Sequence, residues 1–472
     1  MTSPDIKFGT DGWRGIIAWD FNFDNVRKAA QAIADYVRAQ FDTAQELSTH
    51  NVVVGFDRRF LSDQFAFSIA QILRSNKLDV ILLEKPCTTP EISFLTTKKF
   101  WLGVMVTASH NPYQYNGIKI KIKGRSAPQT LTAEVEALLG KGTPLMITSM
   151  PVTRKDFHGE YLDFIHSLSN TKAIGAALKG KIGIDYMYGS AAGILEGMLP
   201  PQKLHVIHGE HDPLFPGINP EPIEQNLSAL METVKKEKLL CGIALDGDGD
   251  RIGFVDDKGN YISPCIINPL LLKYLSENLK RTGKVVQCVS LGYLAKRIAR
   301  EKNIPYEEVP VGFKNIADKM LSEEVLIGAE ESGGYSWKGN PPERDGILTA
   351  LMMLEMMAKT GKKPSELIAE LEAKYGKSSF QRRDFKMTKT VADKNVYSEK
   401  LRKKLPKKIA GQPIAQTLTI DGLKVILDND EWVLMRPSGT EPLLRIYAEA
   451  ESPARTKALL DYAQKLNAAQ IA

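Results

Sequence analysis

The sequence predicts an α/β protein with several domains, the last of which is an α+β domain with an antiparallel sheet. Three observations lead to this prediction. The chain has 472 residues, which is too many for one core at roughly 100–200 residues per domain. Short apolar segments alternate with segments of helical spacing as far as about residue 378, as is typical of βα units. The remaining residues instead contain several short strands close together.

The first segment, residues 1–150, shows the βα alternation most clearly. Residues 51–57 and 80–83 are compact apolar runs and are expected to be strands. Residues 62–75 between them have apolar side chains at helical spacing. A turn rich in proline and threonine then leads to another helix and to a strand at 101–106. We therefore expect one domain with a sheet covered by helices.

The second segment, residues 151–256, repeats this pattern. Strands are expected at 181–185 and 241–246, which are apolar runs bounded by glycine or acidic residues. A glycine-rich stretch at 189–193 is expected to open a helix after the first of them. This segment therefore predicts a second α/β domain.

Two further segments complete the chain. Residues 257–378 contain an expected strand at 285–289 and an apolar helix at 345–359, and form the third α/β domain. Residues 379–472 form the fourth domain, and a hinge is expected near residues 376–383. The elements expected in the fourth domain are strands at 417–420, 424–426, 432–435 and 444–448 and a helix at 453–468.

Composition narrows the class of protein. Hydrophobic residues make up 43% and charged residues 25% of the chain, which is ordinary for a globular protein. The first twenty residues lack a basic stretch followed by an apolar one, and charged residues interrupt the apolar runs. We therefore expect neither a signal peptide nor a membrane span. Scattered cysteines without metal-binding spacing indicate reduced thiols in a cytoplasmic protein: Cys87, Cys241, Cys265 and Cys288.

The net charge of +6 is mild and points to a small anionic substrate. The densest basic runs are residues 119–125 and 401–408, and neither is interleaved with aromatic residues as a nucleic-acid groove would be. The alternative is that these runs are simply a solvated basic surface. We expect no nucleic-acid or membrane partner, and a monomer or weak dimer.

A serine in a polar loop is the first candidate for chemistry. Ser109 follows the apolar strand at 101–106, and Asn111-Pro112 ends regular structure behind it. Its hydroxyl should therefore be exposed at the carboxyl end of a strand, where open α/β sheets bind ligands. The serine could be a nucleophile or a phosphate carrier, or it could only form hydrogen bonds within a turn.

Three carboxylates separated by glycine are the second candidate. Asp246, Asp248 and Asp250 follow another apolar strand, and the intervening glycines let the loop fold its carboxylates around one hard cation. An oxygen-only site of this size suits Mg²⁺. An EF-hand loop would have glycine where Arg251 stands, and a dinucleotide-binding loop would need a different glycine spacing.

Three more loops have residues suited to anions or sugars. Residues 9–15 place Arg14 in a glycine-rich turn, where backbone amides and a guanidinium can share a phosphate. Residues 436–442 combine an arginine, two hydroxyls and open backbone donors. Residues 328–334 offer carboxylates and a hydroxyl, the acceptor and donor types that sugar hydroxyls require. Each of these three loops could equally be a plain connection.

The five loops together resemble those of the α-D-phosphohexomutases, the phosphoglucomutase and phosphomannomutase family. The resemblance covers the whole chain, and the motifs stand in family order: residues 9–15, 107–112, 246–251, 330–333 and 436–440. It implies a four-domain architecture around a central cleft, with three α/β domains with mixed sheets and a C-terminal α+β domain. This agrees with the segments predicted above.

The resemblance also implies roles for individual residues. Ser109 matches the serine that is phosphorylated, and its phosphate and the three aspartates would hold Mg²⁺. Lys119 matches the general acid/base, while His110 and Arg14 match residues that line the same phosphate. The positions that match substrate-binding residues are Arg251, Lys314, Glu330, Ser332, Arg436, Ser438, Gly439 and Thr440.

The implied reaction interconverts a hexose 1-phosphate and a hexose 6-phosphate through phosphoserine and a hexose bisphosphate intermediate. Glu331 in the sugar loop favours glucose. Mannose is less favoured, because Gly334 and Phe313 stand where the mannose-using branch commonly has histidines. Phosphoglucosamine mutase is an alternative, although its sugar loop usually has a different spacer. A glucose-1,6-bisphosphate synthase that uses fructose 1,6-bisphosphate as donor is another, because it would need the same loops.

Two readings from other classes are weaker. A noncatalytic binding paralogue would be expected to have lost Ser109 or an aspartate, and all are present. A metal-dependent phosphatase would share the acidic loop but would not need a separate phosphate loop at 436–440. The sequence therefore favours a phosphotransferase over both.

Overall fold

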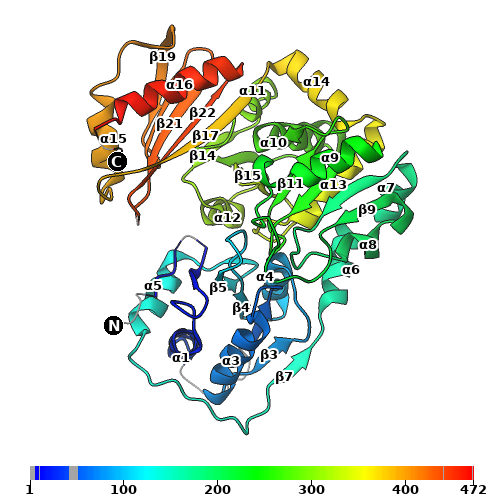
Figure 1. Cartoon of the computed structure of the whole chain (residues 1–472), viewed down its shortest axis with the longest axis vertical. Helices are drawn as coiled ribbons and strands as arrows, with labels where there is room; N and C mark the ends of the chain where they lie inside the picture. Colours follow the sequence, from blue (N-terminus) through cyan, green and yellow to red (C-terminus); the bar gives the residue numbers. More distant parts are fainter. Residues whose placement is uncertain (1–5, 10, 42–50, 440, 470, 472) are drawn as a thin grey trace. The chain divides into compact units, whose positions relative to one another are not determined.

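A computed structural model gives the structure of the chain, of which residues 6–9, 11–41, 51–439, 441–469 and 471 are described (Figure 1). The chain forms two compact units, and each is described by itself. The first comprises Met1–Tyr261 and Gly333–Pro364, and the second comprises Ile262–Ser332 and Ser365–Ala472. Within the described residues, no helix is both long and apolar enough to cross a membrane.

A mixed sheet, seven-stranded over the described residues, forms the amino-terminal part of the first unit. Its order is β1-β5-β4-β2-β3-β7, and β6 pairs with β5. The valine-rich strand β2 is buried along its whole length and runs parallel to β3 and β4, as is typical of a strand covered on both faces. The strands are β1 (Trp13–Ile16), β2 (Val52–Phe56), β3 (Val80–Leu83), β4 (Leu102–Val106), β5 (Tyr115–Ile122), β6 (Arg125–Ser126) and β7 (Thr153–Lys155).

Helices pack against this sheet and against one another. The side chain of Asn22 caps the first helix by accepting the N–H of Asn25, and that of Thr88 caps α4 by accepting the N–H of Glu91. The predicted helix at 62–75 and strand at 80–83 are confirmed with the same bounds. The helices are α1 (Phe23–Ala39), α3 (Ser62–Ser75), α4 (Thr89–Lys98) and α5 (Gln129–Leu138).

A second sheet follows in the same unit, with the order β12-β11-β10-β8-β9. Strand β10 is parallel to β8 and antiparallel to β11, so the residues between β10 and β11 form a hairpin loop. The helix expected to open at 189–193 begins only at Ile194, and the glycine-rich stretch before it is a turn. The strands are β8 (Ile182–Asp185), β9 (Leu204–Ile207), β10 (Gly242–Leu245), β11 (Ile252–Val255) and β12 (Tyr261–Ile262).

The other elements of the first unit surround this sheet or belong to the segment from Gly333. The apolar helix predicted at 345–359 is confirmed as α13 and is shifted by one residue at each end. The elements are α6 (His158–Leu168), α7 (Thr171–Ala177), α8 (Ile194–Met198), η1 (Pro201–Lys203), η2 (Glu224–Asn226), α9 (Ser228–Glu237), β16 (Gly334–Trp337) and α13 (Gly346–Thr360).

The second unit begins with a parallel arrangement. Strand β13 pairs in parallel with β14 on one side and with β15 on the other. Helix α12 packs on β15 and β13, where Ile316 and Phe313 join a buried cluster with Val286. The elements are α10 (Pro264–Lys273), η3 (Tyr274–Asn278), β13 (Lys284–Cys288), α11 (Leu294–Glu301), β14 (Tyr306–Val309), α12 (Phe313–Ser322), β15 (Val325–Glu330) and α14 (Pro364–Tyr375).

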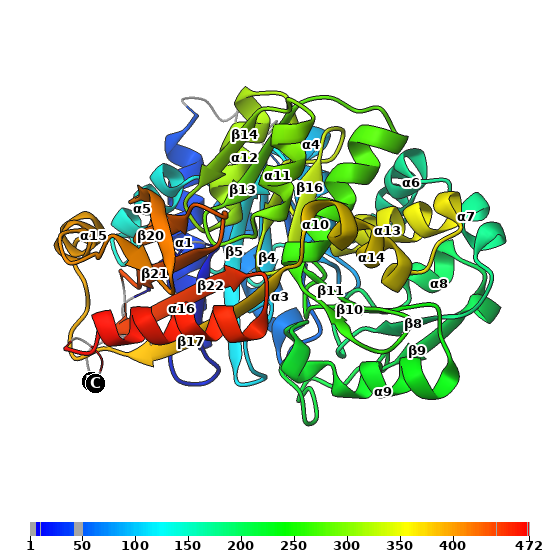
Figure 2. The same cartoon turned by 90° about the horizontal axis from the view of Figure 1, so that it is seen from above.

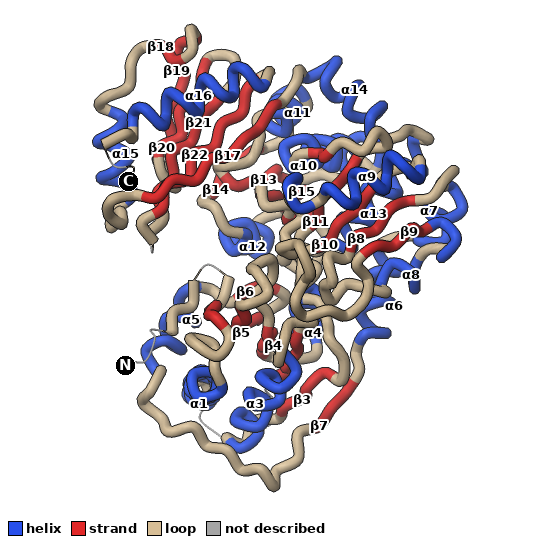
Figure 3. The backbone as a smooth tube through the Cα atoms, viewed as in Figure 1, coloured by secondary structure: helices blue, strands red, loops and turns tan. Residues whose placement is uncertain are grey.

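The carboxyl-terminal sheet of the second unit is antiparallel throughout, as predicted. Its order is β17-β22-β21-β20-β19-β18, and its long strands lie side by side in Figure 3. Helix α16 packs along β22 and β17, as Figure 2 shows. The elements are β17 (Ser379–Lys386), α15 (Lys394–Arg402), β18 (Lys408–Ile409), β19 (Gln412–Leu418), β20 (Leu423–Leu427), β21 (Trp432–Pro437), β22 (Leu443–Ala450) and α16 (Pro453–Leu466).

Two differences between this part of the structure and the prediction exceed two residues. The strand expected at 417–420 is β19, which begins at Gln412 and ends at Leu418. The hinge expected near 376–383 overlaps β17, whose residues from Ser379 onward pair with β22. Only residues 376–378 connect α14 to this sheet, and hinge motion there stays a prediction.

Candidate functional site

The loop that carries Ser109 leaves the carboxyl end of β4, where it was predicted. Ser109 has a φ of 52°, in the left-handed region that residues with side chains rarely adopt. Two hydrogen bonds hold it there: its N–H donates to Thr107 Oγ1 at 2.8 Å, and Arg59 Nη2 donates to its carbonyl at 2.6 Å. The serine is buried, so the prediction of an exposed hydroxyl is wrong. The loop folds back on the aspartate hairpin instead of standing open.

Arg59 is the main support of this loop, and its role was not predicted from the sequence. Its guanidinium donates to the carbonyls of Asn111 at 2.6 Å, Pro112 at 2.9 Å and Tyr115 at 3.1 Å, in addition to that of Ser109. Its Nε lies 3.2 Å from Asp57 Oδ2. One buried cation therefore fixes the path of the chain around the serine.

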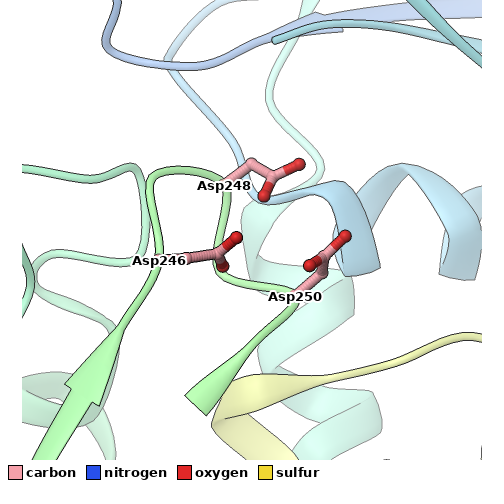
Figure 4. A group of neighbouring side chains, drawn as sticks. All are labelled: Asp246, Asp248 and Asp250. Atoms are coloured by element: carbon pink, nitrogen blue, oxygen red, sulfur yellow. The ribbon is translucent and has the colours of Figure 1, made fainter. Parts of the chain in front are cut away.

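The three aspartates lie together in the hairpin loop between β10 and β11. Figure 4 shows their side chains converging, and their nearest ligand atoms all lie within 4.8 Å of one another. All three are fully buried. Gly249 has a φ of 73°, and a Cβ at Gly247 would stand 2.4 Å from the carbonyl oxygen of Ser109. Glycine is therefore required for the loop to turn and to approach the serine.

Ser109 contacts this cluster directly. Its Oγ donates to Asp246 Oδ2 at 2.8 Å, and the N–H of Arg251 donates to Asp246 Oδ1 at 2.9 Å. Burial and the charges of the two neighbouring aspartates raise the pKa of Asp246 well above its ordinary value. The hydroxyl and the first carboxylate thus form one hydrogen-bonded pair.

Lys119 neutralises the other two aspartates. It lies on β5, and its Nζ is 2.8 Å from Asp248 Oδ2, 3.0 Å from Asp250 Oδ2 and 2.9 Å from Asp11 Oδ2. Burial lowers the pKa of Lys119, but the three carboxylates outweigh burial and leave the pKa above its ordinary value. The lysine therefore carries a proton at neutral pH.

Arg344 and Asp11 complete this network, and neither was named among the predicted site residues. Arg344 Nη2 lies 2.7 Å from Asp250 Oδ2 and 2.9 Å from Asp11 Oδ2. Arg344 lies just before α13, and its neighbour Glu343 forms an ion pair with Lys121 at 2.6 Å. The sequence signal that could have revealed Arg344 is the charged run 343–345 at the start of the apolar helix, where only the helix at 345–359 was predicted.

His110 belongs to the serine loop, and Arg14 contacts this loop through Asn111. His110 Nδ1 is 3.3 Å from Ser109 Oγ. Burial and the nearby charges of Arg251 and Arg14 lower the pKa of His110 well below its ordinary value, so the imidazole is neutral. Arg14 Nη1 donates to Asn111 Oδ1 at 2.6 Å. Arg251 lies beside the cluster, with its Nε 3.8 Å from Asp250 Oδ1.

The residues predicted to bind substrate beyond this cluster belong to the second unit. Glu330 ends β15, and its Oε1 accepts from Ser332 Oγ at 2.6 Å. Lys314 is the second residue of α12. Arg436 is in β21, where its Nε donates to Asp421 Oδ2 at 2.6 Å. Ser438 and Gly439 follow in the turn to β22, whereas Thr440 lies outside the described residues.

The aspartate cluster fits a hard metal ion. Two of its buried oxygens, Asp248 Oδ1 and Asp250 Oδ1, have no hydrogen-bond partner among the residues the structure describes. An orphaned buried carboxylate oxygen is costly unless a cation or a donor satisfies it. The three carboxylates could thus hold a metal ion through oxygen atoms alone.

Models of a known family match the chain from end to end. They describe the α/β/α domains I, II and III and the C-terminal domain of phosphoglucomutase/phosphomannomutase, and they match residues 5–145, 159–259, 266–375 and 362–465 respectively.

Individual relatives agree with this match over nearly their whole length. A phosphoglucomutase/phosphomannomutase of Thermococcus kodakarensis is 31% identical, covering 97% of this chain and 98% of the relative. A phosphoglucosamine/phosphogalactosamine mutase of Sulfurisphaera tokodaii is 29% identical, and the match covers 94% of this chain and 95% of the relative. A crystal structure is known for a Thermus thermophilus protein to which phosphomannomutase activity is ascribed. It matches this chain with a TM-score of 0.86 at 33% identity, and the match covers 98% of this chain and 99% of that protein.

The fold and the family models agree on the architecture. The first three domains have mixed or parallel sheets with helices, and the last has an antiparallel sheet. The acidic cluster is consistent with the metal dependence of the family. The chain therefore belongs to the phosphoglucomutase/phosphomannomutase family of phosphohexomutases, isomerases that transfer phosphate intramolecularly.

Proposed function

We propose that this enzyme interconverts glucose 1-phosphate and glucose 6-phosphate, with Ser109 as the phosphate carrier. The observation that carries the proposal is the placement of the Ser109 hydroxyl. It is held by a strained loop, 2.8 Å from a carboxylate of the acidic cluster and beside the neutral imidazole of His110. A serine that only closed a turn would need neither the strain nor these neighbours.

The reaction consists of two phosphoryl transfers. In the first, the bond between phosphorus and Ser109 Oγ breaks, a bond to the free substrate hydroxyl forms, and Oγ receives the proton that the hydroxyl loses. The hexose bisphosphate then reorients and returns its other phosphate to Ser109. Lys119 is proposed as the general acid/base because its ammonium lies within this cluster, 2.8 Å from Asp248 Oδ2. Most of the catalysis is positioning and electrostatic stabilisation.

Mg²⁺ is the proposed metal, held by Asp246, Asp248, Asp250 and the phosphate on Ser109. The all-oxygen donor set and the two orphaned carboxylate oxygens support it. When bound, the ion would offset the negative charge on the transferring phosphoryl group. Arg14 and His110 would line that phosphate from the protein side.

Most of the residues proposed to bind the substrate belong to the second unit. Glu330 and Ser332 are proposed to bind two sugar hydroxyls. Lys314 and Arg251 are also proposed to bind substrate. Arg436, Ser438, Gly439 and Thr440 are proposed to hold the phosphate that is not reacting. Because the two phosphates exchange places, this loop must accept both orientations of the substrate.

Glucose is the favoured sugar because Glu331 occupies the spacer of the sugar loop. Its carboxylate is half-buried and accepts from Ser290 Oγ at 2.5 Å. Desolvation and the neighbouring charge of Glu330 raise the pKa of Glu331. Mannose 6-phosphate is the second choice and glucosamine 6-phosphate the third. The names of the relatives include both glucosamine and mannose activities, so only a direct comparison of kcat/KM on these sugars decides the order.

The same residues would serve a glucose-1,6-bisphosphate synthase that takes phosphate from fructose 1,6-bisphosphate. The decisive experiment supplies glucose 1-phosphate with a trace of glucose 1,6-bisphosphate, and separately glucose 6-phosphate with fructose 1,6-bisphosphate. Fast formation of glucose 6-phosphate in the first mixture supports the mutase. Slow conversion there, with stoichiometric glucose 1,6-bisphosphate in the second, would establish the synthase. Intact mass before and after phosphatase treatment reports the phosphate on Ser109 in both cases.

A further inference from the structure

Lys394 stands at the start of helix α15, against the loop that follows β21. The Asp393 side chain caps this helix by accepting the N–H groups of Asn395 at 2.7 Å and Val396 at 3.1 Å. Lys394 Cε is the nearest heavy atom to the position that a Cβ on Gly439 would take, at 4.0 Å. The lysine is therefore a direct neighbour of the turn between Arg436 and β22.

Asp421 ties this lysine to Arg436. Its Oδ2 accepts from Arg436 Nε at 2.6 Å, and its Oδ1 accepts from Lys394 Nζ at 2.5 Å. The N–H of Val311 donates to the same carboxylate at 3.2 Å. Burial opposes ionisation of Asp421, but the charges of Arg436 and Lys394 outweigh it and lower its pKa. The carboxylate is therefore ionised and fixes both cations in one place.

Asp421, Arg436 and Lys394 together carry one net positive charge. Asp421 supplies a single negative charge, whereas Arg436 and Lys394 supply two positive ones, and the three side chains are 7%, 13% and 29% exposed respectively. A phosphate monoester carries about −1.5 to −2 charges at pH 7, so one arginine already paired with a carboxylate would leave most of that charge uncompensated. A second cation at the loop, Lys394, would balance part of the phosphate charge that Arg436 leaves uncompensated.

We propose that Lys394 is a second phosphate-binding cation of the 436–440 loop, contributed by helix α15 and positioned by Asp421. The inference rests on the proposed function, in which this loop holds the non-reacting phosphate of a hexose phosphate. Arginine binds phosphate through a planar fork, whereas lysine is a compact charge on a flexible stem. The ammonium can therefore follow a phosphate that arrives in either of the two substrate orientations.

The test measures binding by the full-length protein, independently of turnover. Calorimetric titration with glucose 6-phosphate gives Kd for the wild type and for Lys394→Met, which keeps the aliphatic stem and removes the charge. Loss of one charge-assisted contact is expected to weaken binding roughly 10- to 100-fold. Lys394→Arg should restore most of the affinity. In turnover assays, KM should rise in Lys394→Met while kcat changes little, since the lysine contacts a phosphate that does not react.

Matched variants separate this inference from the function on which it rests. Lys400→Met removes an exposed lysine of the same helix and should bind like the wild type. Weaker binding in Arg436→Met with wild-type binding in Lys394→Met would refute the role of Lys394 and leave the loop assignment intact. Wild-type binding in both variants would refute the loop assignment itself. Equal losses in the Lys394 and Lys400 variants would show a general charge effect and also overturn the inference.

Discussion

A buried glutamate in the second unit should make the stability of this unit depend on pH. Glu449 lies on β22, and its Oε2 accepts from Trp432 Nε1 at 2.7 Å and from the N–H of Tyr293 at 2.8 Å. Its Oε1 is 2.5 Å from Ser378 Oγ. Burial raises the pKa of Glu449 from its ordinary 4.5 to about 7, against the opposing effect of these donors. A protonated Oε1 can donate to Ser378 Oγ, so the neutral form keeps its contacts.

The sign and size of the effect follow from this pKa. The folded protein binds the proton more tightly than the unfolded chain, so the stabilisation is fully present below pH 4.5 and is lost as the pH rises through 7. A difference of about 2.5 pH units, at about 1.4 kcal/mol per unit, corresponds to about 3.5 kcal/mol in total. About 3 kcal/mol of this is lost from the free energy of unfolding between pH 4.5 and 8, because the unfolded glutamate is already half ionised at pH 4.5.

Urea unfolding monitored by tryptophan fluorescence at several pH values from 5 to 8 measures this loss. Glu449→Gln is the control, because its amide oxygen can accept from Trp432 and Tyr293 while its NH₂ donates to Ser378 Oγ. The difference in unfolding free energy between the two proteins should shift by about 2.5 kcal/mol over this range in favour of the glutamine variant, because all other titrating groups cancel. A pH-independent difference would refute the reasoning.

Three further predictions concern the first unit. Ser109→Ala should lower turnover more than about a thousandfold. It should change the unfolding free energy by only about 1 kcal/mol, because one hydrogen bond is lost. Near-normal turnover would rule out the phosphate-carrier role. Asp248→Asn should weaken Mg²⁺ binding, measured by calorimetry, by at least roughly 10- to 100-fold, the loss that is typical even for residues that only hydrogen-bond to a metal ligand. Full activity of the wild type in the presence of a chelator would contradict the metal assignment. Arg59→Met should lower the free energy of unfolding by about 3–5 kcal/mol, because it leaves the Asp57 carboxylate buried without its partner. An unchanged midpoint of urea denaturation would count against Arg59 as the support of the serine loop.

The strands and helices that the sequence predicted correctly share one property: local chemistry defines both of their ends. The strand at 80–83 and the helix at 62–75 are continuous in hydrophobic pattern and are flanked by polar turns. The turn at 189–193 was interpreted as the start of a helix because glycine-rich segments often precede one. In the structure these residues approach the aspartate loop, where Gly189 would carry a Cβ only 2.8 Å from the carbonyl oxygen of Asp246. That approach is a tertiary contact, which local pattern does not contain.

The charged residues of β5 show why part of the site escaped prediction. The run 119–125 suggested a basic surface, yet Lys119 and Lys121 are 1% and 0% exposed. Their partners include Asp11, more than a hundred residues earlier, and Glu343, more than two hundred residues later. A buried charge is tolerable only when such partners exist, and sequence spacing cannot reveal partners that folding brings from distant segments. The five loops were identifiable because each is contiguous, whereas Arg59 and Arg344 lie outside them and act through contacts between segments.

In both units, cations of the proposed site are already paired with carboxylates. Lys119 is held by three aspartates, and Arg436 and Lys394 share Asp421. These pairs keep each cation charged and correctly placed before a ligand arrives, which reduces the ordering cost of binding. They also weaken the attraction for phosphate, because part of each positive charge is already neutralised. A mutase must release and rebind both phosphates of its intermediate in each cycle, so cations of moderate net strength suit the proposed reaction better than unpaired ones would.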